Sequence, residues 1–328
     1  MTDPFLQAIR AAPHDDTPRL IYADWLEERG DPRGEFIRLQ CALNRLPARD
    51  PAAPRLRERL QELLSRYETE WVGPLPALVR AWSFHRGFIT EVTLTARQFL
   101  DHAGELFERL PLHGVRFCEA RRWGARLAAS PYLGRLDALD LRVNYNLWRG
   151  YPVGFLGSVT LAEMNDVIEL FDLQALLASP HLTNLRSLNL DNLRLGSAAA
   201  RAVAAAPNLA GLRRLDLDAN QIGDEGVTVL ARCPYLRRLK VLSLGYNGIT
   251  ARGVETLAAS PHLGRLRCLS LRDNGIGSFR DTKGGAHGVG VLAGTVLPSL
   301  RRLDLRGNGV SDADEAALRC RFGERVRC

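Results

Sequence analysis

The residue types that most often carry catalysis occur in this chain, but their spacing matches no common catalytic or metal-binding motif. The seven histidines are scattered, and the sequence contains no His-Glu-x-x-His motif, no Gly-x-x-x-x-Gly-Lys-Ser/Thr loop and no Gly-x-Ser-x-Gly elbow. The six cysteines include no Cys-x-x-Cys pair of the kind that binds zinc. We therefore expect no catalytic activity, no bound metal and no cofactor.

Two local clusters of chemically active residue types have simpler structural interpretations. Asp24, Glu27, Glu28 and Glu35 alternate with arginines, which predicts ion pairs within and between helices rather than acid–base catalysis. The glycine-rich stretch 284–290 follows a lysine. It lacks the strand–loop–helix context of a phosphate-binding loop, so we expect a flexible loop there.

Composition narrows the class of protein. The chain has 328 residues, 46% of them hydrophobic, which suits one repeat array with a small accessory domain. The net charge of +7 suggests nucleic-acid binding. However, Lys240 and Lys283 are the only lysines and the charges alternate in sign, so we expect a solvated surface instead. Neither a secretory start nor a long apolar stretch occurs, which predicts a cytoplasmic protein without a membrane span.

A leucine pattern that returns every 27 residues indicates how the chain is built. Leu185, Leu212, Leu239 and Leu266 each open a unit with the spacing Leu-x-x-Leu-x-Leu. A fixed period of this size predicts a solenoid, in which each unit buries its apolar face only by stacking on its neighbours. We expect parallel strands on the inside, helices on the outside and an α/β fold.

Three of these four units also have an asparagine just after the expected strand. These residues are Asn220, Asn247 and Asn274. We expect their side-chain amides to bond the backbone of neighbouring turns and to form a ladder. Ser/Ala/Cys-Pro dipeptides near residues 130, 179, 206, 233 and 260 are predicted to end the helices and turn the chain toward the next strand.

The beginning of the chain differs from the repeats. Helical spacing of apolar residues predicts an amphipathic helix through Leu20, Ile21, Ala23, Trp25 and Leu26, followed by further helices up to Trp71. We therefore place an all-α module at 1–80 and a leucine-rich solenoid at 81–328. Ile89, Val92 and Leu94 are assigned to its first strand, and insertions are expected near 143–175 and 277–295.

Two family resemblances follow from these motifs. Residues 89–326 resemble the leucine-rich-repeat superfamily, and the long unit with a full helix is similar to its ribonuclease-inhibitor-like branch, which implies a horseshoe. Residue 193 is Leu where that branch has Asn. The stretch 20–40, LIYADWLEERGDPRGEFIRLQ, resembles the "repeat-companion" domain at the N-terminus of repeat proteins in planctomycete-type bacteria. This resemblance implies a bacterial origin and no particular activity.

Strand positions between the ladder leucines are expected to face a concave, partner-binding surface. We predict a non-catalytic scaffold that binds a protein of unknown identity through this face and through the insertion near 143–175, which contains Trp148. The sequence does not indicate the oligomeric state. The candidate contact residues are Arg142, Trp148, Asn189, Asp191, Arg214, Asp216, Asp218, Tyr246 and Arg272. Plain solvation of a strand face is the competing interpretation.

Two functional alternatives stay open. One is a regulator of an enzyme, such as a GTPase activator, in which Arg142 or Arg149 would act as an arginine finger. The other is nucleic-acid binding through arginine, which would weaken steeply with salt.

Overall fold

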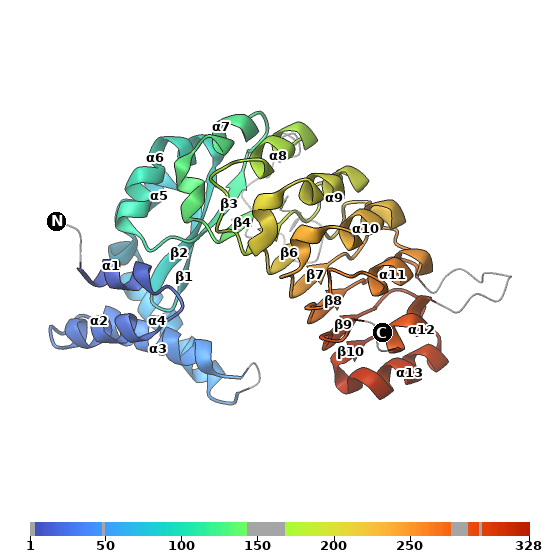
Figure 1. The fold of residues 1–328 in the computed structure, drawn as a ribbon. Coiled ribbons are helices and arrows are strands. Elements are labelled where there is room, and N and C mark those ends of the chain that lie inside the picture. The colour runs from blue at the N-terminus through green and yellow to red at the C-terminus, as the bar shows by residue number, and fades with distance from the viewer. Residues whose placement is uncertain (1–3, 48–49, 143–167, 277–287, 295–296) are drawn as a thin grey trace, which may run out of the picture. The chain divides into compact units, whose positions relative to one another are not determined.

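The computed structural model describes residues 4–47, 50–142, 168–276, 288–294 and 297–328. The chain packs as two compact units, Met1–Arg116 and Phe117–Cys328 (Figure 1). Trp148 and Arg149, most of the predicted insertion at 143–175 and much of that at 277–295 lie outside the described residues.

The first unit begins with the predicted helices. They are α1 (Pro4–Ala11), α2 (Thr17–Glu27), α3 (Arg33–Arg45), α4 (Ala53–Val72) and α5 (Leu75–Leu78). Proline occupies the first turn of α2 and of α4, where its missing N–H has no helical partner to lose. Gly30, with a φ of 72°, turns the chain between α2 and α3.

The buried face of α2 is narrower than its sequence suggests. Ala23 and Leu26 are buried in a cluster with residues of α1, α3 and the following strand. Ile21 and Trp25, which were expected on the same face, are 54% and 38% exposed. Positions 23 and 26 are three residues apart, so their side chains share one side of the helix. Positions 21 and 25 each lie two residues from position 23, so their side chains point to the opposite side.

An antiparallel hairpin follows the helices. Strands β1 (Ala81–His85) and β2 (Phe88–Thr95) are joined by Arg86 and Gly87, which both have positive φ, at 49° and 87°, as a tight hairpin turn requires. Ile89, Val92 and Leu94 lie in β2, which pairs antiparallel with β1, so the strand assigned to the first leucine-rich unit also forms one side of a hairpin.

The hairpin packs on the helices before it. Phe88 joins the cluster that contains Ala23 and Leu26, and Phe84 packs against the cluster around Phe36. Helix α6 (Ala96–Arg109) starts at a capping box formed by Thr95 and Gln98. β3 (Gly114–Cys118) follows it. The first unit thus holds strands in addition to the expected helices.

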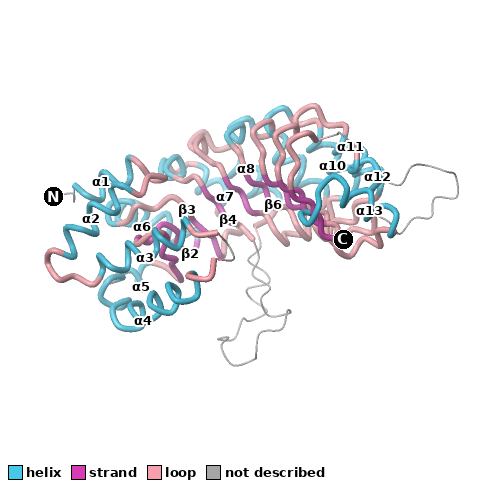
Figure 2. The backbone as a smooth tube through the Cα atoms, turned by 90° about the horizontal axis from the view of Figure 1, so that it is seen from below, coloured by secondary structure: helices cyan, strands magenta, loops and turns pink. Residues whose placement is uncertain are grey.

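The second unit contains a parallel sheet whose strands follow chain order, in accordance with the predicted α/β class. Neighbours pair in sequence from β4 to β10 (Figure 2). The strands are β4 (Ala138–Asp140), β5 (Ser187–Asn189), β6 (Arg214–Asp216), β7 (Val241–Ser243), β8 (Cys268–Ser270), β9 (Arg302–Asp304) and β10 (Val326–Arg327).

A helix accompanies each repeat on the other side of the core. The helices are α7 (Gly124–Ala128), α8 (Leu170–Leu177), α9 (Ser197–Ala204), α10 (Gly223–Ala231), α11 (Ala251–Ala258), α12 (Gly288–Ala293) and α13 (Asp312–Phe322). Short 3-10 turns start at Pro131, Pro207 and Pro234, where the sequence predicted the helices to end. Gly288 and Gly290, expected in a flexible loop, belong to α12.

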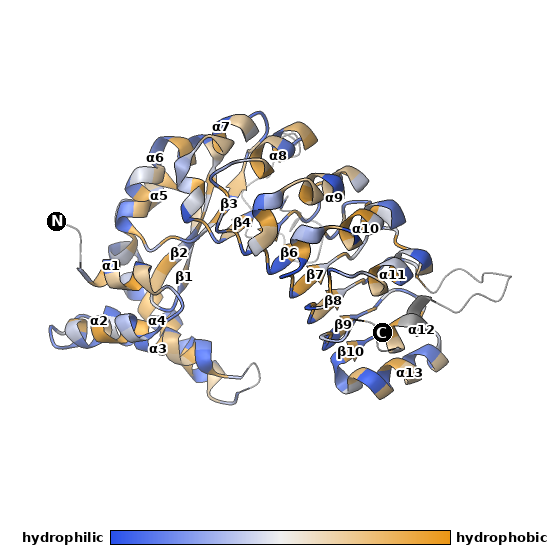
Figure 3. Cartoon of the chain, viewed as in Figure 1, coloured by the Kyte–Doolittle hydropathy of each residue, from blue (hydrophilic) through white to orange (hydrophobic). Residues whose placement is uncertain are grey.

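Leucines and asparagines hold successive repeats together. Leu215, Leu242 and Leu269 are the central residues of their strands, pair in register and are at most 2% exposed. The residues on either side of them in the same strands are half-buried or exposed, and Figure 3 shows hydrophobic and hydrophilic colours along the repeats. Such alternation places one face of the sheet on the core and leaves the other to polar residues.

The predicted asparagine ladder is confirmed. Asn247 Oδ1 accepts hydrogen bonds from the backbone N–H groups of Asn220 and Ile222, at 3.0 and 3.2 Å. Its Nδ2 donates to the carbonyl oxygens of Leu217 and Gly245. Asn274 and Asn308 repeat this arrangement. Each asparagine therefore completes the turn of the repeat that precedes it.

The ladder stops where the sequence departs from the pattern. Leu193 replaces the expected asparagine and is buried instead, at 3% exposure. Asn220 Oδ1, which would accept from that preceding turn, is buried without a hydrogen-bond partner among the described residues. The substitution of leucine for asparagine at position 193 thus coincides with one unsatisfied acceptor.

Candidate functional site

A row of polar residues crosses the strands at positions between the ladder leucines. Asp140, Asn189, Asp216, Ser243, Ser270 and Asp304 occupy equivalent positions of β4 to β9 and pair in register. Each lies next to a buried ladder leucine, so the row belongs to the side of the sheet away from the core. We call this side the strand face.

Several residues of the row have a local structural role that sequence reasoning missed. Oδ1 of Asn189 accepts a hydrogen bond from the N–H of Asp191 at 2.9 Å. Asp216 accepts in the same way from Asp218, at 3.1 Å. Such bonds to the backbone two residues later hold the turn that follows a strand. The repeated Asp or Asn at this position was the available signal.

Acidic side chains gather next to the middle of the strand face. Burial, together with the nearby charges of Asp218 and Asp191, raises the pKa of Asp216 to about 7. Asp218 is only 7% exposed. Its Oδ1 accepts the N–H of Gly245 at 2.7 Å, which satisfies that oxygen within the neighbouring repeat.

Arg272, two repeats further along the chain, pairs with one of these carboxylates. Arg272 Nη2 donates to Asp218 Oδ2 at 3.0 Å. The Arg272 side chain crosses Gly245, where a Cβ atom would lie 2.7 Å from its Cγ. Its guanidinium carbon lies 5.1 Å from the centre of the Tyr246 ring, within range of a cation–π contact. Glycine at 245 therefore permits the bridge.

We name the group Asp191, Asp216, Asp218, Tyr246 and Arg272 the central cluster. The structure brings these five predicted contact residues together through the pair just described and the interactions that raise the pKa of Asp216. Asn189 lies beside Asp216 in the row.

The other predicted contact residues lie outside the central cluster. Arg214 is exposed at the start of β6. Arg142 pairs with Asp140, its Nε 3.0 Å from Oδ2. This pairing gives no support to an arginine finger at Arg142, because a finger must present an available guanidinium to phosphate.

The carboxylates of the first unit pair with arginine, as predicted. Arg38 contacts both Asp24 and Glu27, and Arg59 Nε lies 2.7 Å from Glu35 Oε1. Within the described ranges, no group of three or more His, Cys, Asp or Glu residues is placed to hold a metal ion. No helix among the described residues is long and apolar enough to cross a membrane.

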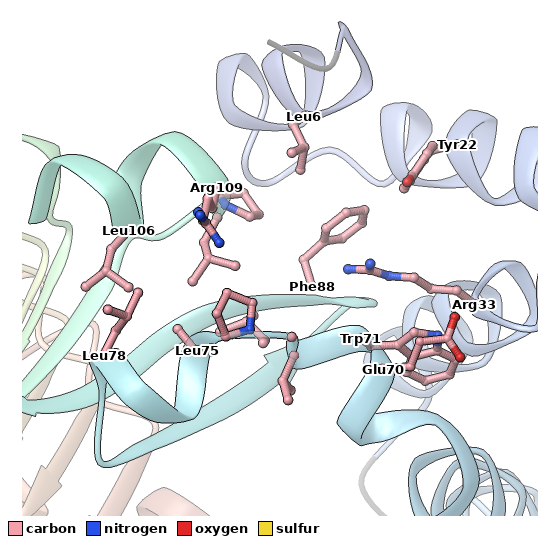
Figure 4. A pocket seen from close by; sticks show the side chains of 16 residues that line it. Leu6, Tyr22, Arg33, Glu70, Trp71, Leu75, Leu78, Phe88, Leu106 and Arg109 are labelled. Atoms are coloured by element: carbon pink, nitrogen blue, oxygen red, sulfur yellow. The ribbon is translucent and has the colours of Figure 1, made fainter. Parts of the chain in front are cut away.

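A cavity of about 270 Å³ in the first unit was not anticipated from sequence. It lies among α1, α2, the start of β2 and the C-terminal ends of α4 and α6 (Figure 4). Its lining includes Leu6, Tyr22, Arg33, Trp71, Phe88 and Arg109. These residues come from six different elements, so no local spacing in the sequence indicates that they meet.

Comparison with known proteins bears on the second unit. Residues 212–231, 235–258 and 296–314 match the family model described as "Leucine Rich repeat". The matched stretches contain β6 with α10, β7 with α11, and β9. No curated protein matches the chain. Repeats of this family generally mediate protein–protein interaction and are typically non-catalytic. These matches, with the parallel strands and the asparagine ladder, support the presence of leucine-rich repeats in the second unit.

Proposed function

We propose that this chain is a non-catalytic scaffold that binds a protein partner on the strand face, with the central cluster at the middle of the contact. The observation that carries the proposal is the bridge from Arg272 to Asp218, which spans the repeats at β6, β7 and β8. It holds charged and aromatic groups in fixed positions. Arginine and tyrosine so placed are the residue types enriched at the centres of protein interfaces.

The strand face also has a charge pattern that suits a partner of mixed charge. Arg214 and Asp216 lie together in β6, and Arg302 and Asp304 lie together in β9. The strand β7 has Val241 and Ser243 at its outward positions. A face with both signs of charge in single repeats is complementary to a partner that also carries both signs.

The test compares two matched charge reversals. The intact chain, an Arg214→Glu variant on the strand face and an Arg252→Glu variant on helix α11 are used to capture proteins from nuclease-treated lysate of the native cells. Both arginines are exposed. We expect a protein captured by the intact chain and by Arg252→Glu, and lost with Arg214→Glu. The dissociation constant is then measured with the purified partner.

Other outcomes have distinct meanings. Equal capture by all three chains would refute binding at the strand face. Loss with Arg252→Glu alone would move the contact to the helical side. If nuclease treatment removes all captured material, nucleic-acid binding replaces the proposal. A captured GTPase whose turnover rises on addition of the chain would favour the regulator over a passive scaffold.

A further inference from the structure

The cavity in the first unit combines apolar walls with cationic groups. Leu6, Leu75, Phe88 and Leu106 supply apolar surface, and Arg33 and Arg109 lie on opposite sides of Phe88 (Figure 4). The guanidinium carbon of Arg33 is 5.7 Å from the centre of the Phe88 ring. A largely apolar pocket with a few fixed polar groups is typical of small-molecule sites.

The charges of the lining favour an anionic ligand. Two guanidinium groups and one carboxylate, that of Glu70, line the cavity. Arg109 is 54% exposed and already pairs with Glu105 at 2.9 Å. Arg33 is half-buried and lies beside the Phe88 ring in the lining, so it is the better placed of the two to hold an anion against apolar surface.

A second buried arginine strengthens this bias. Arg19 is 1% exposed, and its guanidinium carbon lies 6.0 Å from the same Phe88 ring. Nη1 donates to the Asp15 carbonyl oxygen at 2.7 Å, but Nε has no hydrogen-bond partner among the described residues. Burial and the neighbouring Arg86 lower the pKa of Arg19.

Nearby carboxylates only partly offset these cations. Arg86 donates to Asp16 at 2.9 Å, and Arg45 contacts the other oxygen of the same carboxylate. Asp15 and Asp16 also act on Arg19, so the charge bias rests on the two guanidinium carbons that lie within 6.0 Å of the centre of the Phe88 ring, those of Arg19 and Arg33. Since charges act more strongly where water is excluded, these two cations favour an anion in the cavity.

The size of the cavity limits the ligand. A volume of about 270 Å³ lies just under the ~300 Å³ at which drug-sized pockets begin. At roughly 30 Å³ per water-sized group, it holds a body of about ten non-hydrogen atoms. A helix or a stretch of chain is too large for this space.

We propose that the cavity binds a small carboxylic acid with an apolar body. The carboxylate contacts the Arg33 guanidinium, and the apolar body packs on Phe88 and against Leu6, Leu75 and Leu106. This site is separate from the strand face, so its test is independent of the proposed scaffold function.

Sodium octanoate is a suitable probe because it has about ten non-hydrogen atoms, the size derived above. It is titrated into the intact chain with leucine methyl groups labelled for NMR. We expect saturable shifts at Leu6, Leu75, Leu78 and Leu106. 1-Octanol, with the same tail and no charge, should bind on the order of tenfold more weakly, and octylammonium more weakly still.

Two arginine variants locate the carboxylate. Arg33→Gln should weaken octanoate by about tenfold and leave the octanol affinity unchanged. Arg97→Gln, on the exposed side of α6 where Arg97 pairs with Asp101, should change neither. If Arg33→Gln alters the methyl spectrum of the free protein, Leu6→Trp provides a second test, because it fills the cavity from partly exposed α1 and should abolish both shifts.

Three results would overturn the proposal. These are octanoate binding no tighter than octanol, shifts confined to leucines of the second unit, or unchanged octanoate affinity in a folded Arg33→Gln or Leu6→Trp variant.

Discussion

Replacing Asp216 by asparagine should stabilise the protein at alkaline pH. The carboxyl group is held among Asp191 and Asp218 in a buried position, which raises its pKa from 3.8 to about 7. Asparagine suits the site, because Asn189 occupies the equivalent position of the preceding repeat and makes the same bond to the backbone. Asp216→Asn thus removes the charge and keeps the Oδ1 acceptor.

The sign and size of the effect follow from the raised pKa. Between about pH 4 and pH 7 the folded chain keeps a proton on Asp216 that the unfolded chain releases, so the free energy of unfolding falls as pH rises through this window. Above pH 7 the cost is on the order of 2–4 kcal/mol. Asp216→Asn should recover most of this at pH 8 and change stability by less than about 0.5 kcal/mol at pH 4.

Urea unfolding followed by circular dichroism at the two pH values measures the gain. The matched control is Asp304→Asn in the same row, where Arg306 donates to both carboxylate oxygens, at 2.8 and 2.6 Å, and lowers the pKa. That stabilisation is present above the unfolded pKa and lost as pH falls, so Asp304→Asn should destabilise more at pH 8 than at pH 4. A carboxyl NMR titration showing Asp216 ionising near pH 4, or equal gains at both pH values, would refute the reasoning.

Two further changes test the repeat turns. Asn247→Ala removes four side-chain hydrogen bonds at a position that is 2% exposed. It should lower the free energy of unfolding in urea by at least about 3 kcal/mol, because buried partners are left unsatisfied. The control Asn184→Ala removes an exposed hydrogen bond and should lower it by under about 1 kcal/mol. Gln221 has a φ of 60° where the next repeats have Gly248 and Gly275, so Gln221→Gly should raise stability by about 0.5–1 kcal/mol. A drop in the urea midpoint would contradict this, and Gln174→Gly inside α8 should lower it by about 1 kcal/mol.

The second unit was largely predictable because its signals are periodic. Leucines that recur every 27 residues are buried only when the repeats stack on one another. The register of the strands, the asparagine ladder and the residues of the strand face can therefore be predicted from their positions in the repeat. The bond between Asn247 and the preceding turn was anticipated for the same reason.

The central cluster and the cavity depend on contacts between distant residues. Nothing in the sequence states that Arg272 passes over Gly245 to a carboxylate 54 positions earlier. Phe88 packs on residues of α2 and α3, a contact that no spacing in the sequence indicates. Apolar spacing identifies a buried strand but does not distinguish the partners that bury it.

The asparagine ladder gives the repeats a direction. The side-chain oxygens of Asn247, Asn274 and Asn308 accept from the turn before them, as Asn274 does from Asn247 and Ile249. During synthesis, the backbone N–H groups of such a turn therefore lack these hydrogen bonds until the next asparagine has left the ribosome. Deleting repeats from the C-terminal end exposes an unfinished turn, whereas deleting them from the N-terminal end leaves the remaining turns bonded. Cotranslational folding of this array should consequently lag one repeat behind elongation.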